Sequence, residues 1–259
     1  MGLNARVPHR AILLPGAVLP ARLAYTALID ALGPDVDAVA KDLDLYAADA
    51  PPPGYTLEHE VEGVLREADA RGWRNFHLVG YSAGGASALA FATRHPERLS
   101  SLALLEPAWA GRWDLSAAEA AVRRQAGRLA DLPSAEEYMV AFVGLNLAPG
   151  VEPTPPPPGV ELPSPESRQA GITALMRSFE TYDLDRDALA GFGRPVYYAL
   201  GARSNQDQYG EIAKRLSRVF GDFELEVFDE RHHFDPPHRV EPERLARSLR
   251  ALWARAEQV

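Results

Sequence analysis

Short apolar runs alternate along this chain with segments whose apolar residues fall at helical spacing. The runs typical of strands cover residues 10–14, 36–40, 76–79, 99–105, 195–200 and 223–228. Between them, residues such as Leu57, Val61 and Val64 recur every three or four positions, which is the spacing of one helical face. This alternation predicts an α/β fold: a doubly wound, mainly parallel sheet of about six strands with helices on both faces.

Turn-forming residues mark the ends of several of these elements. Pro15-Gly16 stops the first strand, and Thr56 is placed to cap a helix that Gly72 ends. A final helix is expected to begin near Pro242. Active sites in parallel α/β sheets lie beyond the carboxyl ends of the strands. We therefore expect the functional side chains among the residues that directly follow a strand.

Residues 107–190 interrupt the alternation, because they contain no convincing strand. Serine and glutamate occur there at capping-box spacing, as Ser116 with Glu119 and as Ser134 with Glu137. These pairs and a later periodic segment predict three helices, over about 116–130, 134–147 and 165–182. We interpret residues 107–190 as a helical lid inserted into an α/β core formed by residues 1–106 and 191–259.

A proline-rich stretch over residues 149–165 lies within this insertion and includes Pro155-Pro156-Pro157-Pro158. Because consecutive prolines cannot continue a helix, the stretch is predicted to be an extended surface loop. A linker or loop explains this composition more simply than a ligand for a signalling domain does.

Composition narrows the class of protein. The chain has 259 residues, 46% hydrophobic and 24% charged, which suits one large domain or a domain with an insertion. Its net charge of −9 argues against nucleic acid or an anionic membrane as a partner. With no cysteine, it has no disulfide, thiolate nucleophile or cysteine-ligated metal. Because no signal-peptide core or membrane-spanning run is seen, we expect a cytoplasmic protein.

The pentapeptide Gly80-Tyr81-Ser82-Ala83-Gly84 lies between a strand-like run and an alanine-rich helical segment. A G-x-S-x-G pattern alone is weak, but a strand, a tight turn and a helix are the setting in which such a serine becomes a nucleophile. The glycines let the backbone turn sharply without a Cβ clash. The pattern predicts that the Ser82 hydroxyl stands above the sheet, although a purely structural serine is the alternative.

The chain resembles the α/β-hydrolase family over nearly all of its length outside the inserted helices. The resemblance rests on Pro15-Gly16, on Gly80–Gly85, on Arg94-His95-Pro96-Glu97-Arg98-Leu99, and on the strand–histidine–helix ending from Phe223 to Trp253. The chain order, with the nucleophile first and the histidine last, also matches the family. The family usually has two further strands before the first loop. Only about nine residues precede the first strand here, so six strands are expected.

The resemblance also implies an oxyanion hole, which stabilises the negative charge of a tetrahedral intermediate. The family's first loop often reads His-Gly, whereas this loop reads Pro15-Gly16. By position, the backbone N–H of Ala17 is one donor and that of Ala83 is the other. Each such donor typically contributes a few kcal/mol to transition-state stabilisation.

The general base that accepts the Ser82 proton is expected near the C-terminal end, where His232, His233 and His238 lie. The family's ending, a strand, a short turn with glycine, a histidine and an apolar residue, assigns the base to His233. His232 takes the place of the glycine and remains the alternative. A metal site built from these histidines and Asp235 is a further reading, but no helical register supports it, and no metal is expected.

The acid that orients the histidine has two possible positions. The family usually places it after the penultimate strand, where this chain has Ser204-Asn205 and, slightly later, Asp207. Some members place it directly after the strand that follows the nucleophile helix, where this chain has Glu106. We assign the role to Glu106, because a carboxylate beside a buried strand is costly unless it is paired. Asp207 remains an alternative for the acid, and a helix cap is the structural alternative for Glu106.

These assignments predict a serine hydrolase that cleaves an ester-type bond of a small organic substrate through an acyl-enzyme, with Ser82, His233 and Glu106 as its triad. A thioesterase, a C–C bond hydrolase and a non-catalytic ligand-binding protein are the alternatives. Trp109 and Trp113 follow Glu106 closely and are expected to line the substrate pocket, with packing at the base of the lid as the alternative. The resemblance implies no cofactor, and a small-molecule substrate is the expected partner.

Overall fold

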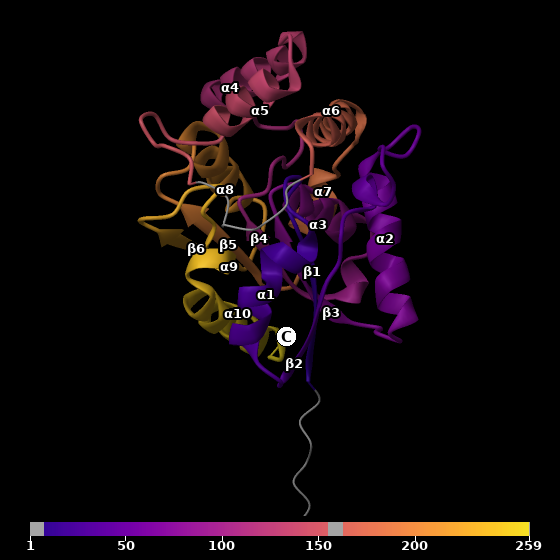
Figure 1. Ribbon diagram of the computed structural model, residues 1–259. Coiled ribbons are helices and arrows are strands. Elements are labelled where there is room, and N and C mark those ends of the chain that lie inside the picture. The colour runs from indigo at the N-terminus through magenta and orange to yellow at the C-terminus, as the bar shows by residue number, and fades with distance from the viewer. Residues whose placement is uncertain (1–7, 155–162, 259) are drawn as a thin grey trace, which may run out of the picture.

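The computed structural model describes residues 8–154 and 163–258. Its six strands are β1 His9–Leu14, β2 Val36–Ala40, β3 Phe76–Tyr81, β4 Leu99–Leu105, β5 Val196–Gly201 and β6 Phe223–Phe228. They form one sheet in the order β2-β1-β3-β4-β5-β6, and every neighbouring pair is parallel. This topology confirms the predicted fold class (Figure 1).

Ten α-helices are described: α1 Ala21–Leu32, α2 Leu57–Ala70, α3 Ala83–Arg94, α4 Ala117–Gly127, α5 Ala135–Leu145, α6 Pro165–Thr181, α7 Arg186–Ala190, α8 Glu211–Leu216, α9 Pro237–Val240 and α10 Pro242–Ala256. Short helical turns add Asp44–Tyr46, Pro96–Arg98, Arg128–Asp131 and Gln206–Gly210. Within this described part of the chain, no helix is both long enough and apolar enough to cross a membrane.

Each face of the sheet has its own hydrophobic core, because consecutive strand residues point to opposite sides. Ile12 and Leu14 of β1 belong to the core that α2 and α3 cover. Ala11 and Leu13 of the same strand belong to the core that α1 and α10 cover. The sheet is therefore buried on both sides, with α1 and α10 on one side and α2 and α3 on the other (Figure 1).

Side-chain caps fix the start of several helices. The Thr56 hydroxyl accepts a hydrogen bond at the start of α2, as predicted. The hydroxyls of Ser116 and Ser134 each accept a backbone N–H three residues later, from Glu119 and Glu137, at 3.1 Å. These caps confirm the predicted starts of α4 and α5. The side chain of Glu119 has other partners, two arginines, which are described below.

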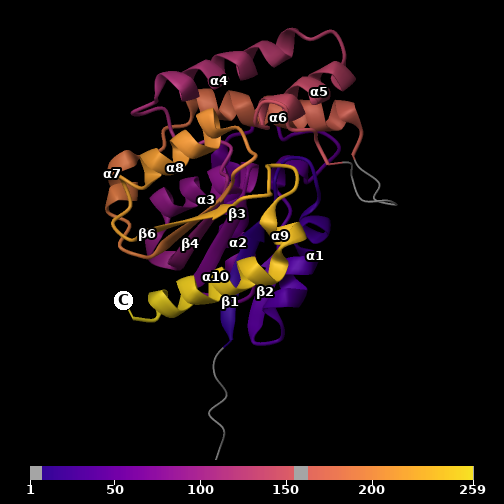
Figure 2. The same cartoon turned by 90° about the vertical axis from the view of Figure 1, so that its left-hand side faces the viewer.

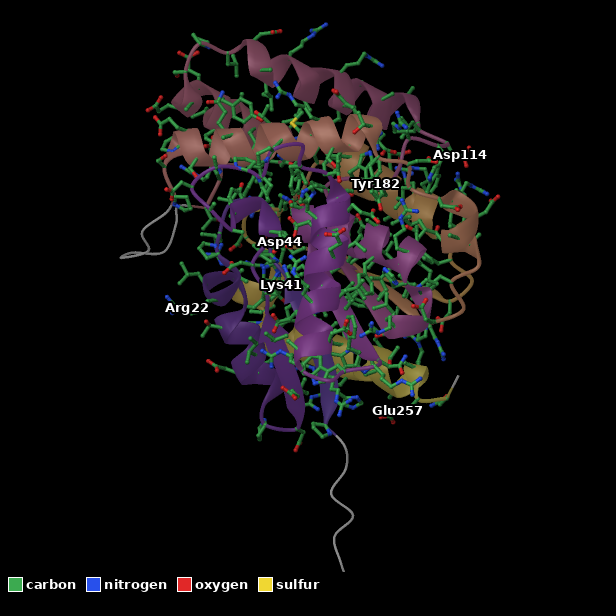
Figure 3. The ribbon with its side chains drawn as sticks, turned by 90° about the vertical axis from the view of Figure 1, so that its right-hand side faces the viewer. Arg22, Lys41, Asp44, Asp114, Tyr182 and Glu257 are labelled. Carbon is green, nitrogen blue, oxygen red and sulfur yellow. The ribbon has the colours of Figure 1, made fainter. Side chains whose placement is uncertain are left out.

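Helices α4, α5 and α6 come between β4 and β5 in the sequence and lie above the sheet, over the carboxyl ends of its strands (Figures 1 and 2). Tyr182 follows α6 and joins this layer to the core, since its hydroxyl donates to Glu58 of α2 at 2.9 Å. Figure 3 labels Tyr182 at this junction. Of the predicted proline-rich loop, residues 155–162 lie outside the described residues.

Candidate active site

Ser82 occupies the tight turn between β3 and α3. Its φ of 52° lies in the left-handed region, which a residue other than glycine rarely adopts. The neighbouring glycines make this turn possible: a Cβ on Gly80 would lie 2.3 Å from the Gly84 carbonyl oxygen, and one on Gly84 would lie 2.4 Å from the Leu14 oxygen. The two glycines are therefore required by close packing around the turn.

His233 and Glu106 lie next to this serine, although they are far from it in sequence. His233 Nε2 is 3.0 Å from Ser82 Oγ, and His233 Nδ1 is 2.9 Å from Glu106 Oε2. All three residues are buried. A carboxylate can only accept, so Nδ1–H donates to Glu106 and Nε2 is left to accept the serine proton. The arrangement is a hydrogen-bonded chain from hydroxyl to imidazole to carboxylate.

Glu106 directly follows β4 and is held in place from two directions. Its backbone has a φ of 47°, positive like the φ of 52° at Ser82, which follows β3 in the same way. Its second carboxylate oxygen accepts the backbone N–H of Gly201 at 2.8 Å. Asp207, the alternative acid, is exposed, and its own N–H is capped by the Asn205 side chain at 3.1 Å. The structure therefore places Glu106, and not Asp207, beside the imidazole.

The other two C-terminal histidines have different surroundings. His232 Nδ1 accepts the N–H of Phe234 at 3.2 Å, and its Nε2 lies 3.1 Å from the Thr154 hydroxyl. Burial lowers the pKa of His232. His238 is fully buried, with its ring 4.9 Å from that of Tyr25, and burial lowers its pKa to about 3. Within residues 8–154 and 163–258, no three histidine, aspartate or glutamate side chains are grouped to hold a metal ion.

The two expected oxyanion donors lie beside the serine. Ala83 is the first residue of α3, so its N–H has no intrahelical acceptor. Ala17 follows the Pro15-Gly16 turn and lines a cavity wall together with Ser82 and Ala83. Its carbonyl accepts the Tyr46 hydroxyl at 2.7 Å, which fixes the loop.

Two cavities meet at Ser82. The first, which we name the Trp109 cavity, measures about 200 Å³ and is lined by Ser82, Ala83, Trp109 and residues of α4, α5 and α6. The second, the His233 cavity, measures about 710 Å³ and is lined by Ser82, His233, Tyr81 and residues of α5. Ala17, Ser82 and Phe142 contribute to both walls. The hydroxyl therefore faces space on two sides.

The two tryptophans expected at the site lie in different places. Trp109 lines the cavity named after it and stacks on Phe179 of α6, with ring centres 5.1 Å apart and the planes within 2°. Trp113 is not among the described residues that line either cavity. Its indole N–H donates to the Leu184 carbonyl at 3.2 Å, and its ring packs under the Arg215 guanidinium at 4.6 Å.

Two tyrosines that the sequence did not single out hold His233. The Tyr209 ring stacks on the imidazole, with centres 4.5 Å apart and an angle of 13°. The hydroxyl of Tyr81, the second residue of the serine motif, donates to the backbone oxygen of His233. Tyr81 could have been found from the sequence, because it ends β3 and directly precedes the proposed nucleophile. Nothing in the local pattern around Tyr209 predicts its stack.

Comparison with known proteins agrees with this fold. Residues 28–135, less than half of the chain, match the family described as the alpha/beta hydrolase fold. Over 54 residues the chain is 41% identical to RutD of Caulobacter vibrioides, whose name gives it provisionally as a carbamate hydrolase. That match covers 21% of this chain and 20% of the relative, so it spans about a fifth of either protein.

Solved structures resemble the chain over nearly its whole length. An alpha/beta hydrolase named MGS-M2, from a Medee basin deep-sea metagenome library, superposes with a TM-score of 0.72 at 14% identity, covering 98% of this chain and 92% of that one. A thermophilic esterase from Thermogutta terrifontis gives 0.63 at 20% identity, with coverages of 96% and 91%. Carboxylesterase CesB from Bacillus subtilis gives 0.60 at 18% identity, with coverages of 95% and 84%.

These likenesses, together with the six-stranded parallel sheet, show that the chain has the alpha/beta-hydrolase fold. At these identities the structural neighbours establish the fold alone.

Proposed function

We propose that this protein is a serine hydrolase that cleaves carboxylic esters through an acyl-enzyme. The observation that carries the proposal is the buried chain of contacts from Ser82 through His233 to Glu106, at 3.0 and 2.9 Å. Ser82 Oγ attacks the ester carbonyl while His233 takes its proton, and Glu106 stabilises the imidazolium that forms. The carbonyl oxygen becomes an oxyanion, for which the N–H groups of Ala17 and Ala83 are the proposed donors.

The tetrahedral intermediate then collapses to an acyl-enzyme, which water hydrolyses. His233 returns the proton to the leaving oxygen, an alcohol departs, and Ser82 keeps the acyl group. A water molecule, deprotonated by His233, attacks the acyl-enzyme and releases the carboxylic acid, and Ser82 recovers its proton. No step in this sequence requires a cofactor.

The two cavities support an orientation for the substrate. The leaving oxygen must lie near His233 Nε2 to receive its proton. The alcohol part of the ester therefore belongs in the His233 cavity, which His233 itself lines. The acyl part then belongs in the Trp109 cavity, whose wall includes Ser82 and Ala83. Under this proposal, α4, α5 and α6 act as a lid, because they supply much of the wall on the acyl side.

A carbamate is the second candidate substrate, because the RutD relatives carry that provisional name over the matched 54 residues. The same attack on a carbonyl would serve both classes. A thioester and a C–C bond between carbonyls are also compatible with a triad of this kind.

The test combines labelling with a substrate panel. A fluorophosphonate probe is expected to label Ser82 alone, as read by mass spectrometry of the digested protein. p-Nitrophenyl esters of rising acyl length, and a matched carbamate, then rank the substrate classes by kcat/KM. Failure of the probe to react, with no ester or carbamate turned over, would leave a ligand-binding protein on a hydrolase scaffold as the better account.

A further inference from the structure

The wall of the Trp109 cavity carries charge at one place. Glu119 and Arg123 lie one helical turn apart on α4, and both line the cavity, as does Arg112 from the segment before α4. The remaining wall is mainly apolar and includes Val122, Ala126, Ile172, Leu175 and Phe179. The Trp109 cavity, which begins at Ser82 and is mainly apolar, thus also has charged groups in its wall.

The carboxylate in this cluster already has its partners. Glu119 is 1% exposed and accepts from Arg215 at both oxygens, at 2.6 Å from Nη2 and 3.2 Å from Nε. Arg123 Nη2 donates to the same carboxylate at 3.0 Å. Arg215 also donates from Nη1 to the Ala110 carbonyl at 2.5 Å. Glu119 and Arg215 therefore form a closed, buried pair that ties α4 to α8.

The Arg123 guanidinium uses only one of its three nitrogens in hydrogen bonds to described residues. Its hydrogen bonds to described residues all use Nη2, which also donates to the Gly111 carbonyl at 2.6 Å. Its side chain is 27% exposed, so Nη1 and Nε remain available to a ligand in the cavity. Arg112 is exposed, and its one hydrogen bond within the described chain runs from Nη1 to the backbone oxygen of Glu180 at 2.6 Å.

The charged residues that line this cavity balance in number: Arg112 and Glu180 are exposed, while Arg123 and Glu119 lie deeper. Arg215, which does not line the cavity, binds both oxygens of the buried Glu119 carboxylate. Arg123 therefore shares an acceptor that another guanidinium already occupies. Burial lowers the pKa of Arg123; Glu119 opposes this effect, and the neighbouring arginines add to it. An added anion would offset this crowding of cations.

We propose that the Trp109 cavity takes an acyl group that carries a carboxylate at its far end, with Arg123 as the binding residue and Arg112 as a second contact. The inference rests on the proposed esterase function and names the class of acyl group that this site takes. The apolar wall contacts the methylene groups, whose burial favours binding. The guanidinium fork matches the terminal carboxylate. The preferred substrates are half-esters of dicarboxylic acids.

The experiment compares two phenyl esters of the same acyl length, monophenyl adipate and phenyl hexanoate, on the purified full-length protein. The proposal predicts that kcat/KM favours the adipate by about 10–100-fold, mainly through a lower KM, as for a hydrogen bond to a charged group. Arg123→Gln is expected to remove most of this preference. Arg124→Gln changes an exposed arginine on the same helix that does not line the cavity, and it should keep the preference.

The outcomes separate the two proposals. Hydrolysis of phenyl hexanoate without any preference for the adipate overturns the inference and leaves the esterase proposal standing. Turnover of neither ester, nor of the wider panel, overturns both. Because Arg123 also bonds Glu119 and Gly111, Arg112→Gln serves as a second variant if Arg123→Gln does not fold. A preference retained in both folded variants would contradict the assignment to these arginines.

Discussion

At the scale of single residues, the conformation of Glu106 links its backbone to its proposed chemistry. The residue adopts a left-handed φ of 47° directly after β4, a conformation that costs energy for a residue with a side chain. In that conformation its carboxylate receives both the Gly201 N–H and the His233 ring. A helix cap needs neither contact, so the geometry favours an orienting role.

Glu106→Gln tests that role. The amide keeps the shape but loses the charge that stabilises the imidazolium, so kcat for an ester is expected to fall by several orders of magnitude. Asp207→Asn is the matched control, because Asp207 is exposed while the two imidazole nitrogens contact Glu106 and Ser82, and it should cost tenfold or less. Steady-state kinetics of the two purified variants decide. The reverse ranking would assign the acid to Asp207.

Two buried histidines provide a second prediction, on stability. Burial lowers the pKa of both His77 and His238 to about 3, below the ordinary value of about 6.5 that they regain on unfolding. Between these values the unfolded chain binds more protons than the folded one. The contribution of these two residues to stability is therefore fully present above pH 6.5, and it falls as the pH decreases toward 3 by about 1.4 kcal/mol per pH unit for each residue.

Urea unfolding at several pH values between 7 and 4 measures this slope. In His238→Gln the decline is expected to be shallower than in the wild type by about one proton's contribution, because only His77 of the pair remains. Wild type and variant curves that run parallel over this range would show that His238 is not held neutral by the fold.

At the scale of elements, features that depend on neighbouring residues could be predicted from the sequence, whereas contacts between distant residues could not. The strand ends that carry Ser82 and Glu106, and the serine caps of α4 and α5, could be predicted because each depends on neighbours in sequence. The Glu119–Arg215 pair spans 96 residues, so no local pattern shows it. Ser116 and Glu119 matched a capping box, yet the Glu119 carboxylate bonds two arginines instead, because burying it requires charged partners.

A third prediction concerns how the inserted helices select the acyl length, and it compares Trp109 with Trp113. Trp109→Ala removes an aromatic wall of the acyl-side cavity and should extend the accepted acyl length, seen as lower KM for longer p-nitrophenyl esters. Trp113→Ala is the control, because Trp113 packs on Arg215 and does not line the described cavity walls. A folding check is needed, since Trp109 is buried against Phe179. Equal shifts in both variants would mean that the preference follows general loosening of the insertion.

At the scale of the whole molecule, one sheet positions all three proposed catalytic groups. Neighbouring parallel strands β3 and β4 end in Ser82 and Glu106, and the segment after β6 supplies His233. Strand ends narrowed the candidates in the sequence, and the resemblance to a known family then selected His233 and Glu106 among them. The cavity walls could not be predicted, because they come from side chains of α4, α5 and α6 that converge only in the folded protein.

The nucleophilic role of Ser82 is the claim on which the rest depends, and Ser82→Ala tests it most directly. Alanine fits the turn, so the variant is expected to fold while kcat for the best ester falls on the order of 10⁴–10⁶. Ser87→Ala is the matched control: Ser87 is buried in the same helix segment and donates to the Ala83 carbonyl at 3.0 Å, so activity should stay within tenfold. Ester hydrolysis retained within tenfold in Ser82→Ala would contradict the serine mechanism.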